Sequence, residues 1–402
     1  MRSHASPPAS TLNPKVAGSI PARPITKAQG TESSPAVTDA LSLLEAIERL
    51  HPEPYRNVAP GVLRRQAERA ADVPGTQRDR GIVELMRLAA LLGERNGHTG
   101  ISPWREHPKP FEAFPVRAYE FDEGTFAVAA VDPSLVGCEL VAIAGIPLPE
   151  VTAAVSPLIP HDNEWTVRER RPRFLVVAEV LRGLGLVEAD DPVIWRVRSS
   201  SGERELALET LPIDECRRLL DPPRPPRSIE TLDEGRVLHV AYNVTLGETS
   251  RFAAEIVSRA RRAEAVVLDL RHNAGGNNQT YGPLLAALER LTAAGKRLAV
   301  LTSRVTFSAA MQLVVDLEQR TPAVFVGEPT GASPNHYGDP EAVVLPHTQV
   351  SARVATISWT TAGAADTRTT REPDVFIPLS AAAFFSGADP VLGGALEQLA
   401  AG

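Results

Sequence analysis

The chain has 402 residues and a net charge of −7, with a share of apolar residues that is ordinary for a globular protein. This length allows two or three domains with a sizeable core. The negative charge gives no electrostatic support for general binding to nucleic acids or anionic membranes. The two cysteines, Cys138 and Cys216, lie far apart without metal-ligand spacing, so we expect buried thiols.

Residues 1–36 are expected to lie outside the folded part, as a disordered or wrongly assigned leader. They are rich in Ser, Pro, Ala and Thr and lack the apolar centre of a signal peptide. No apolar run in the chain approaches the roughly 18–20 residues of a membrane span. We therefore expect a cytoplasmic protein without membrane insertion.

Residues 37–105 are expected to form a small helical N-terminal domain. Thr38 or Asp39 can cap a first helix whose apolar residues share one face, namely Leu43, Leu44, Ile47 and Leu50. The same periodicity predicts a second helix over about Gln77–Leu92. A Gly-rich turn, "ERNGHTGISP" at Glu94–Pro103, then leads into an extended segment.

Residues 106–226 change to a β-rich pattern and are expected to form a middle module. A hairpin with a Ser-Gly turn is predicted at Val193–Leu211, and a helix at about Arg173–Gly185. The other predicted strands are Thr125–Asp132 and Cys138–Leu148. The stiff "PPRPP" segment, Pro222–Pro226, marks the boundary.

Residues 227–402 alternate between strand and helix patterns. Glu264–Arg271 contains a continuous apolar run, which is typical of a strand buried on both faces. Strands separated by helices of this length predict crossover connections and a parallel sheet, that is, an α/β domain. The remaining predicted strands are Arg236–Asn243, Arg297–Ser303 and Thr321–Val326, and the predicted helices are Glu248–Arg262, Pro283–Ala294 and Ala309–Gln319.

Three loops follow the carboxyl ends of these predicted strands, at Arg271–Asn278, Thr302–Ala310 and Gly327–Asp339. Ligand and catalytic sites of open α/β sheets form at this edge. Two of the loops are Gly-rich, and the third carries Ser308 at the start of a predicted helix. The sequence therefore predicts a site where the three loops meet.

Ser308 is the candidate nucleophile of this site. Free backbone N–H groups and the positive dipole end at a helix start both favour an oxyanion. The N–H of Gly275 or Gly276, together with that of Ala309, could form an oxyanion hole, worth ~2.7–4 kcal/mol per donor. Taken alone, however, Ser is also a favoured N-cap.

The glycines of "NAGGNN", Asn273–Asn278, also allow a second interpretation. Glycines after a strand often form turns, and such a loop can cradle a phosphate. The chain lacks the GxGxxG spacing and the Walker Lys-Ser/Thr pair, which weakens the hypothesis of a nucleotide site.

Several segments in order resemble the carboxyl-terminal-processing serine peptidase family, S41, which includes the tricorn protease core and the interphotoreceptor retinoid-binding protein repeats. The resemblance covers nearly everything from about residue 38 onward. The similar segments are "LLGERNGHTGI" (91–101), "LVGCELVAIAGIPLPEV" (135–151), "VVLDLRHNAGGN" (266–277), "TSRVTFSAAMQLVVDLE" (302–318), "VGEPTGASPNHYGD" (326–339), "DTRTTREPDVFIPLS" (366–380) and "GADPVLGGALEQL" (387–399).

The resemblance implies a Clp protease/crotonase-like parallel-sheet catalytic domain and a PDZ-like middle module that offers a sheet edge to an extended peptide. It also implies that Ser308 is the nucleophile, with Gly275 or Gly276 and Ala309 at the oxyanion hole.

The general base is expected to be His98. The bacterial processing proteases use a Lys after the nucleophile, but Lys296 is the last lysine of this chain. Arginine cannot serve, because its pKa is too high. His98 lies in the tricorn-like "GHT" element, and a neutral imidazole suits the role. His336, in "SPNHYGD", is the competing base; its structural alternative is a loop histidine bonded to Asp339.

Asp366 is the first choice for the acid that orients the histidine, because "DTR" lies just before "PDVFIP" in the closing segment. Asp374 and Glu372 are expected to cap or pin a strand. Asn273 and Asn335 are expected to fill polar loops, with binding of the substrate backbone as the alternative.

The combined prediction is a serine-type peptidase, or peptidase-like hydrolase, that cleaves a peptide or protein substrate through an acyl-enzyme. No metal or organic cofactor is implied, and no nucleic acid partner. One alternative is a catalytically silent protein that binds a peptide or small molecule on the same scaffold. Another is a biosynthetic role on a ribosomally made peptide, with or without cleavage.

Overall fold

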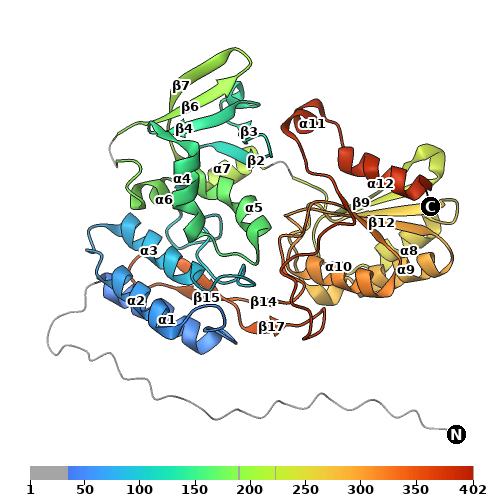
Figure 1. The fold of residues 1–402 in the computed structure, drawn as a ribbon, viewed down its shortest axis with the longest axis horizontal. Coiled ribbons are helices and arrows are strands. Elements are labelled where there is room, and N and C mark those ends of the chain that lie inside the picture. Colours follow the sequence, from blue (N-terminus) through green and yellow to red (C-terminus); the bar gives the residue numbers. More distant parts are fainter. Residues whose placement is uncertain (1–34, 189–190, 222, 402) are drawn as a thin grey trace, which may run out of the picture. The chain divides into compact units, whose positions relative to one another are not determined.

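The computed structural model describes residues 35–188, 191–221 and 223–401, so residues 1–34 of the expected leader lie outside the described part. The described chain is a mixed α/β protein with several sheets (Figure 1). None of its described helices has both the length and the apolar character that a membrane span requires.

Three helices open the described chain: α1 (Pro35–Leu50), α2 (Pro60–Ala71) and α3 (Arg78–Ala90). The structure confirms the two predicted helices and adds α2. The buried face of α2 is small (Leu63, Gln66, Ala67 and Ala70), which leaves a weak apolar periodicity in its sequence. Asp39 does not cap α1; its carboxylate accepts hydrogen bonds from the backbone N–H groups of His347 and Thr348, both at 2.8 Å.

The middle region contains an antiparallel sheet with the strand order β2-β3-β4-β6-β7, which confirms the predicted hairpin as β6 and β7. The predicted single helix Arg173–Gly185 is wrong. The chain instead forms α5 and α6, because Val177 is extended between them. The elements are β1 (Glu112–Ala113), β2 (Val116–Glu120), β3 (Thr125–Ala130), β4 (Glu139–Ile143), β5 (Ile146–Pro147), α4 (Leu148–Val155), α5 (Glu164–Leu175), α6 (Ala178–Gly183), β6 (Val193–Ser199), β7 (Gly202–Leu208), β8 (Leu211–Pro212) and α7 (Ile213–Leu220).

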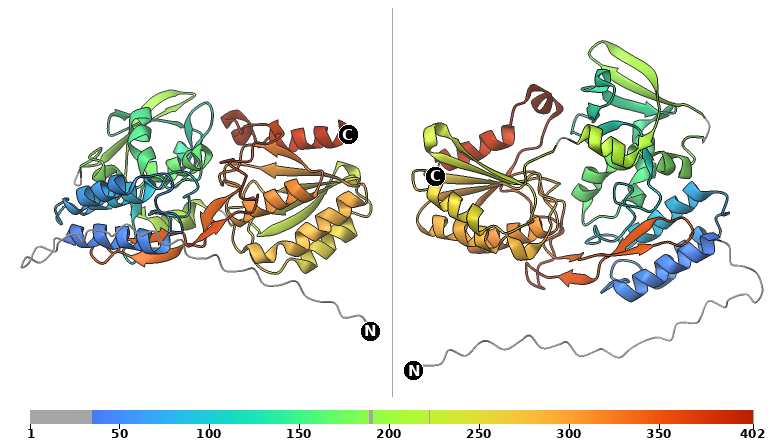
Figure 2. Two further views of the ribbon diagram at one scale, coloured as in Figure 1. Left: turned by 60° about the horizontal axis from the view of Figure 1, so that its bottom comes forward. Right: turned by 180° about the vertical axis from the view of Figure 1, so that it is seen from behind.

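A hairpin from late in the sequence shares the core of the N-terminal helices and the middle region. Its strands are β15 (Glu341–Val344) and β16 (Ser351–Val354), which lie beside α1 (Figure 2). Apolar residues in and next to it, Leu345, Val350, Ala352 and Val354, are buried in the same hydrophobic cluster. The hairpin therefore connects the region after the loop Gly327–Asp339 to the N-terminal helices.

The second large sheet has the order β18-β13-β12-β11-β10-β9. It is parallel except for β9, which pairs antiparallel with β10. The predicted parallel sheet is thus confirmed, and the edge strand β9 is an addition. The strands are β9 (Arg227–Leu232), β10 (Val237–Tyr242), β11 (Ala265–Asp269), β12 (Arg297–Thr302), β13 (Val324–Gly327) and β18 (Val375–Phe376).

Helices cover both faces of this sheet (Figure 1). On β11, Val266 and Leu268 belong to one apolar cluster, and Ala265 and Val267 to another. This alternation confirms the predicted burial on both faces. The first cluster contains buried residues of α8 (Ser250–Arg259), α9 (Gly282–Ala293) and α10 (Ala309–Arg320). The second contains buried residues of α12 (Pro390–Ala401). The remaining strands and α-helix of the described chain are short: β14 (His336–Gly338), β17 (Ile357–Trp359) and α11 (Ala381–Ser386).

Candidate active site

Ser308 stands between β12 and α10, in a backbone conformation that is rare for a residue with a side chain. Its φ is 55° and its ψ is −126°. Ser308 occupies the N-cap position of α10, but its side chain makes no capping hydrogen bond. Instead its Oγ lies 3.0 Å from Nε2 of His98. The side chain therefore faces the histidine rather than the helix it precedes.

We expect this backbone strain to be measurable by comparing two variants that both lack the hydroxyl. Ser308→Gly should be more stable than Ser308→Ala by about 1 kcal/mol. Relief of a strain of about 1–3 kcal/mol is partly offset by glycine's entropy of about 0.5–1 kcal/mol. Chemical denaturation of the two variants checks this; equal stabilities, or a less stable glycine variant, would mean that the turn is unstrained.

His98 is held beside Ser308 by backbone contacts from three parts of the chain. The N–H of Gly97 donates to Oδ1 of Asp162 at 2.7 Å, and the carbonyl of Gly97 accepts from Arg170 at 2.7 Å. The N–H of Gly100 donates to the carbonyl of Arg353 at 2.9 Å. These contacts fix the loop that carries His98, a residue 210 positions before Ser308 in the sequence.

The glycine before His98 is required by close packing. A Cβ at Gly97 would lie 2.7 Å from Cζ of Phe307 and 2.8 Å from Oδ1 of Asp162. Asp162 itself is fully buried and also accepts from the N–H of Ser333 at 3.0 Å. It thus joins the histidine loop to the loop after β13. Asp162 could not be recognised from the sequence, because nothing in "PHDNEW" (160–165) distinguishes it from an ordinary helix start.

The environment of His98 favours the neutral imidazole. Burial lowers its pKa well below the ordinary 6.5, and the nearby charges of His336 and Arg170 lower it further. The ring is therefore unprotonated at neutral pH and able to accept a proton through Nε2. Its Nδ1 is buried and has no hydrogen-bond partner among the described residues.

His336 lies next to His98, and its described hydrogen bond is not to Ser308. The two rings are stacked, with centroids 5.4 Å apart, and Nδ1 of His336 pairs with the carbonyl of Ser333 at 3.0 Å. The expected hydrogen bond to Asp339 is absent from the described contacts. Asp339 instead accepts from the indole N–H of Trp359 at 2.7 Å.

Gly275 abuts the nucleophile directly. Its φ is 100°, and a Cβ there would lie 2.6 Å from Cβ of Ser308 and 3.0 Å from the backbone nitrogen of Ala309. The N–H of Gly275 already donates to Oδ1 of Asn273 at 2.9 Å. The backbone N–H groups of Gly276 and Ala309 make no hydrogen bond to a described residue. These two N–H groups are therefore the available candidates for an oxyanion hole.

The side chain of Asn273 joins the glycine loop to the end of β10. It is fully buried, and its amide group donates to the carbonyl of Tyr242 at 2.8 Å. The side chain of Asn335 likewise bonds within the protein, to the carbonyls of Gly363 and Asp366. In the described contacts both asparagines therefore fill polar loops.

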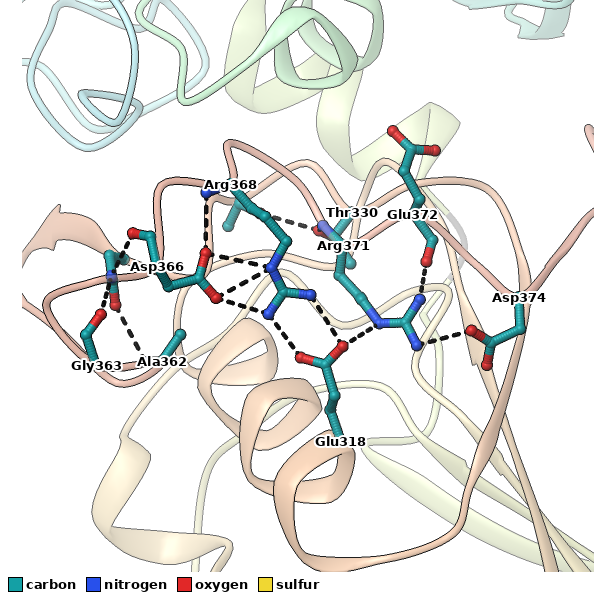
Figure 3. Close-up of polar contacts among 11 residues, drawn as sticks. Glu318, Thr330, Ala362, Gly363, Asp366, Arg368, Arg371, Glu372 and Asp374 are labelled. Atoms are coloured by element: carbon teal, nitrogen blue, oxygen red, sulfur yellow. Dashed lines mark hydrogen bonds and ion pairs between the residues drawn. The ribbon is translucent and has the colours of Figure 1, made fainter.

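Asp366 is not brought to His98. Figure 3 shows its carboxylate on the guanidinium of Arg368, with ion-pair distances down to 2.7 Å. Arg368 also pairs with Glu318 near the end of α10, at 2.8 Å. Because Arg368 is only two residues away, it captures the carboxylate locally and lowers its pKa. Orientation of His98 by Asp366 thus has no support from the contacts.

Asp374 and Glu372 lie further along the same segment. The carboxylate of Asp374 accepts from the backbone N–H of Phe325 on β13 at 2.8 Å, which confirms that it pins a strand. Glu372 contributes only its backbone carbonyl to the contacts that Figure 3 shows, as the acceptor for Arg371.

No family model and no curated protein matches the sequence. Solved structures do match the fold. Mature CPAF has 15% sequence identity, with 90% of this chain and 95% of that chain covered and a TM-score of 0.63. Mature CPAF in complex with lactacystin has 13% identity, coverage of 90% and 96%, and a TM-score of 0.61. A putative S41 protease from Bacteroides fragilis has 14% identity, coverage of 89% and 97%, and a TM-score of 0.43.

The chain has an S41-like peptidase fold. This confirms the resemblance that the sequence motifs indicate, at the level of the fold.

A cavity of about 610 Å³ opens at the serine of this S41-like fold. Ser308, His98, Gly275 and Gly276 line it. A second cavity, of about 660 Å³, shares with it the lining residues Trp104, Glu169, Arg173, His272 and Val305. The site thus continues from the serine into a longer path. Among the described residues, no group of three or more His, Cys, Asp or Glu side chains could hold a metal ion.

Proposed function

We propose that this protein is a serine-type peptidase that cleaves peptide bonds through an acyl-enzyme. The observation that carries the proposal is the 3.0 Å contact between Oγ of Ser308 and Nε2 of a neutral His98, on a strained turn against Gly275. Such strained turns occur where a nucleophile must be exposed at the start of a helix.

The proposed reaction follows from these positions. His98 takes the hydroxyl proton while Oγ forms a bond to the substrate carbonyl carbon, and the carbonyl oxygen becomes an oxyanion. The N–H groups of Gly276 and Ala309 hold that oxyanion. The imidazolium then gives its proton to the leaving amine as the C–N bond breaks. Water, deprotonated by His98, releases the acyl group and restores Ser308.

The same proposal assigns a Clp protease/crotonase-like architecture to the catalytic sheet and a PDZ-like role to the middle region. β2 is the edge strand of its sheet and lies against α5. Residues of β2, from Val116 to Tyr119, line the second cavity. An edge strand beside a helix can accept an extended peptide as an added strand. A peptide bound there could continue along the shared cavity lining towards Ser308.

One observation favours the silent binding protein as a second candidate. If His98 accepts the serine proton at Nε2, its Nδ1 carries a hydrogen, and no described side chain accepts from it. In serine peptidases an acid at this position orients the imidazole and stabilises its charged form. A scaffold that only binds peptide does not need that acid.

Labelling with a fluorophosphonate probe separates the two candidates. A peptidase labels, whereas Ser308→Ala does not label and His98→Ala labels far more slowly. Lactacystin, which is bound to mature CPAF, serves as a second probe. If the wild type fails to label, or if Ser308→Ala labels equally well, the peptidase proposal is wrong.

The pH dependence of the labelling rate gives a prediction for the base. A base works only while it is unprotonated, so the rate falls as the pH drops through the pKa of His98. Because that pKa is lowered, we expect the midpoint of the acid limb below 6.5. A midpoint at or above 6.5 would contradict the assignment of the buried His98 as the base.

A further inference from the structure

The turn that carries His98 begins at Asn96. The carbonyl of Asn96 accepts a hydrogen bond from the N–H of Thr99 at 2.9 Å, so these two residues are the first and the last of a four-residue turn. His98 is the third residue of that turn, and Asn is a favoured residue at the first position. The direction in which the His98 side chain leaves the turn therefore depends on how Asn96 is held.

Asn96 is buried, and both ends of its side-chain amide are hydrogen-bonded. The amide nitrogen Nδ2 donates to the carbonyl groups of Leu92 and Glu94, both at 3.0 Å. The amide oxygen Oδ1 lies 2.6 Å from Nε2 of His51, which is likewise buried. Because Nδ2 is engaged by two carbonyl groups, the oxygen is the end of the amide that faces the histidine.

His51 follows the last residue of α1, and its contacts define one tautomer of the ring. Its Nδ1 accepts a hydrogen bond from the backbone N–H of Glu53 at 3.1 Å, so the ring hydrogen is on Nε2 and is donated to Asn96. Burial lowers the pKa of His51, which favours the neutral ring at neutral pH. The ring also packs against Tyr337, with centroids 4.5 Å apart. Asn96 thus receives its hydrogen bond from a firmly held donor.

His51 takes no direct part in the proposed reaction. It does not line the cavity at Ser308, and in the described contacts its ring bonds to Asn96 and Glu53. Without the ring, however, Oδ1 of Asn96 would be a buried acceptor that has lost its donor, which is an unfavourable state. Asn96 would reorient to find another partner, and the turn with His98 would move with it.

We infer that His51 is a positioning residue: through Asn96 it holds the His98 turn so that Nε2 of His98 stays within hydrogen-bond distance of Oγ of Ser308. This inference rests on the proposed function. Misplacing a catalytic group by about 1 Å can cost about 10²-fold in rate. Because His51 lies outside the cavity, its effect falls on the proton transfer rather than on substrate binding.

Steady-state kinetics of two His51 variants test this role. His51→Leu keeps a similar volume but has no donor, and it should lower kcat about 10–100-fold while KM changes less than about threefold. His51→Gln offers a side-chain N–H in place of Nε2, so it should recover most of the lost kcat. The substrate is a peptide found by library turnover.

His107→Leu is the matched control. His107 is a second buried histidine, but its ring bonds to the carbonyl of Ser102 and to the N–H of Ser351 rather than to the His98 turn. The variant therefore makes the same replacement at a buried site without removing the donor to Asn96. It should lower kcat far less than His51→Leu does. Thermal unfolding of each variant sets an assay temperature at which all of them are folded.

Hydrogen–deuterium exchange with mass spectrometry tests the turn without requiring activity. Residues 94–100 contain the N–H groups of Gly97 and Thr99, which are hydrogen-bonded in the turn and its support. Exchange in this segment should be faster in His51→Leu, because the turn opens more often. In His51→Gln and His107→Leu, exchange there should stay close to that of the wild type.

The inference is overturned if exchange in residues 94–100 is unchanged in His51→Leu. It is also overturned if His107→Leu loses as much kcat, if His51→Gln is no better than His51→Leu, or if the loss appears in KM. A failure of the peptidase proposal looks different: the wild type then does not label with a fluorophosphonate, while exchange in this segment still depends on His51.

Discussion

Replacing Ser308 or His98 with alanine is expected to lower kcat/KM by about 10⁴–10⁶-fold, and the double variant should lose little more. The two groups act as a unit, since the hydroxyl is a weak nucleophile without a base and the imidazole has no proton to accept without the hydroxyl. The 3.0 Å contact between Nε2 of His98 and Oγ of Ser308 lets both groups take part in the same proton transfer. Steady-state kinetics on a peptide found by library turnover measures the effect.

His336→Ala is the matched control for the histidine. Its ring is buried and stacked on His98, so the variant removes a similar volume without removing the contact to Ser308. We expect a loss below about tenfold, because His336 acts only through the position and pKa of His98. If His336→Ala lost as much activity as His98→Ala, or His98→Ala kept most of it, His98 would not be the base.

Gly275→Ala is expected to lower kcat at least about 10²-fold, because misplacing a catalytic group by about 1 Å can cost that much. The added methyl group would lie 2.6 Å from Cβ of Ser308 and 2.8 Å from the carbonyl oxygen of Phe307, so the nucleophile turn must shift. The φ of 100° adds strain for any residue other than glycine.

Gly282→Ala is the control for this substitution. Gly282 begins α9, has no positive φ, and a Cβ there meets nothing within 4 Å. The activity and the stability of the Gly282→Ala variant should match those of the wild type. Circular dichroism of Gly275→Ala separates a displaced nucleophile from a failure to fold. A folded Gly275→Ala with normal kcat would contradict the close approach of the two loops.

The periodicity of the sequence was sufficient for the parallel sheet and for the loops at its edge. Apolar runs such as that of β11 are long and regular, and they reflect burial on both faces. The edge strand β9 was missed, because its mixed polar sequence directly follows the Pro-rich boundary segment. The split between α5 and α6 was missed as well, since Val176 and Val177 fit an apolar helix face yet leave the helical conformation.

The candidate site was predictable only in part. Ser308 and the glycine loop follow from local position, but nothing local brings His98 to them. That pairing came from the resemblance and depends physically on Asp162 and Arg353, residues without a recognisable pattern. Asp366 was chosen from its place in the closing segment. Sequence spacing does not reveal that Arg368 and Glu318 hold it in an ion-pair network.

The central claim is that Ser308 forms a covalent acyl-enzyme with the help of His98. Intact-mass analysis after reaction with a fluorophosphonate, followed by peptide mapping, tests it most directly. We predict one added group per chain on wild-type protein, located on Ser308, and much slower modification of His98→Ala. An unmodified wild type, or a label on any residue other than Ser308, would contradict the claim.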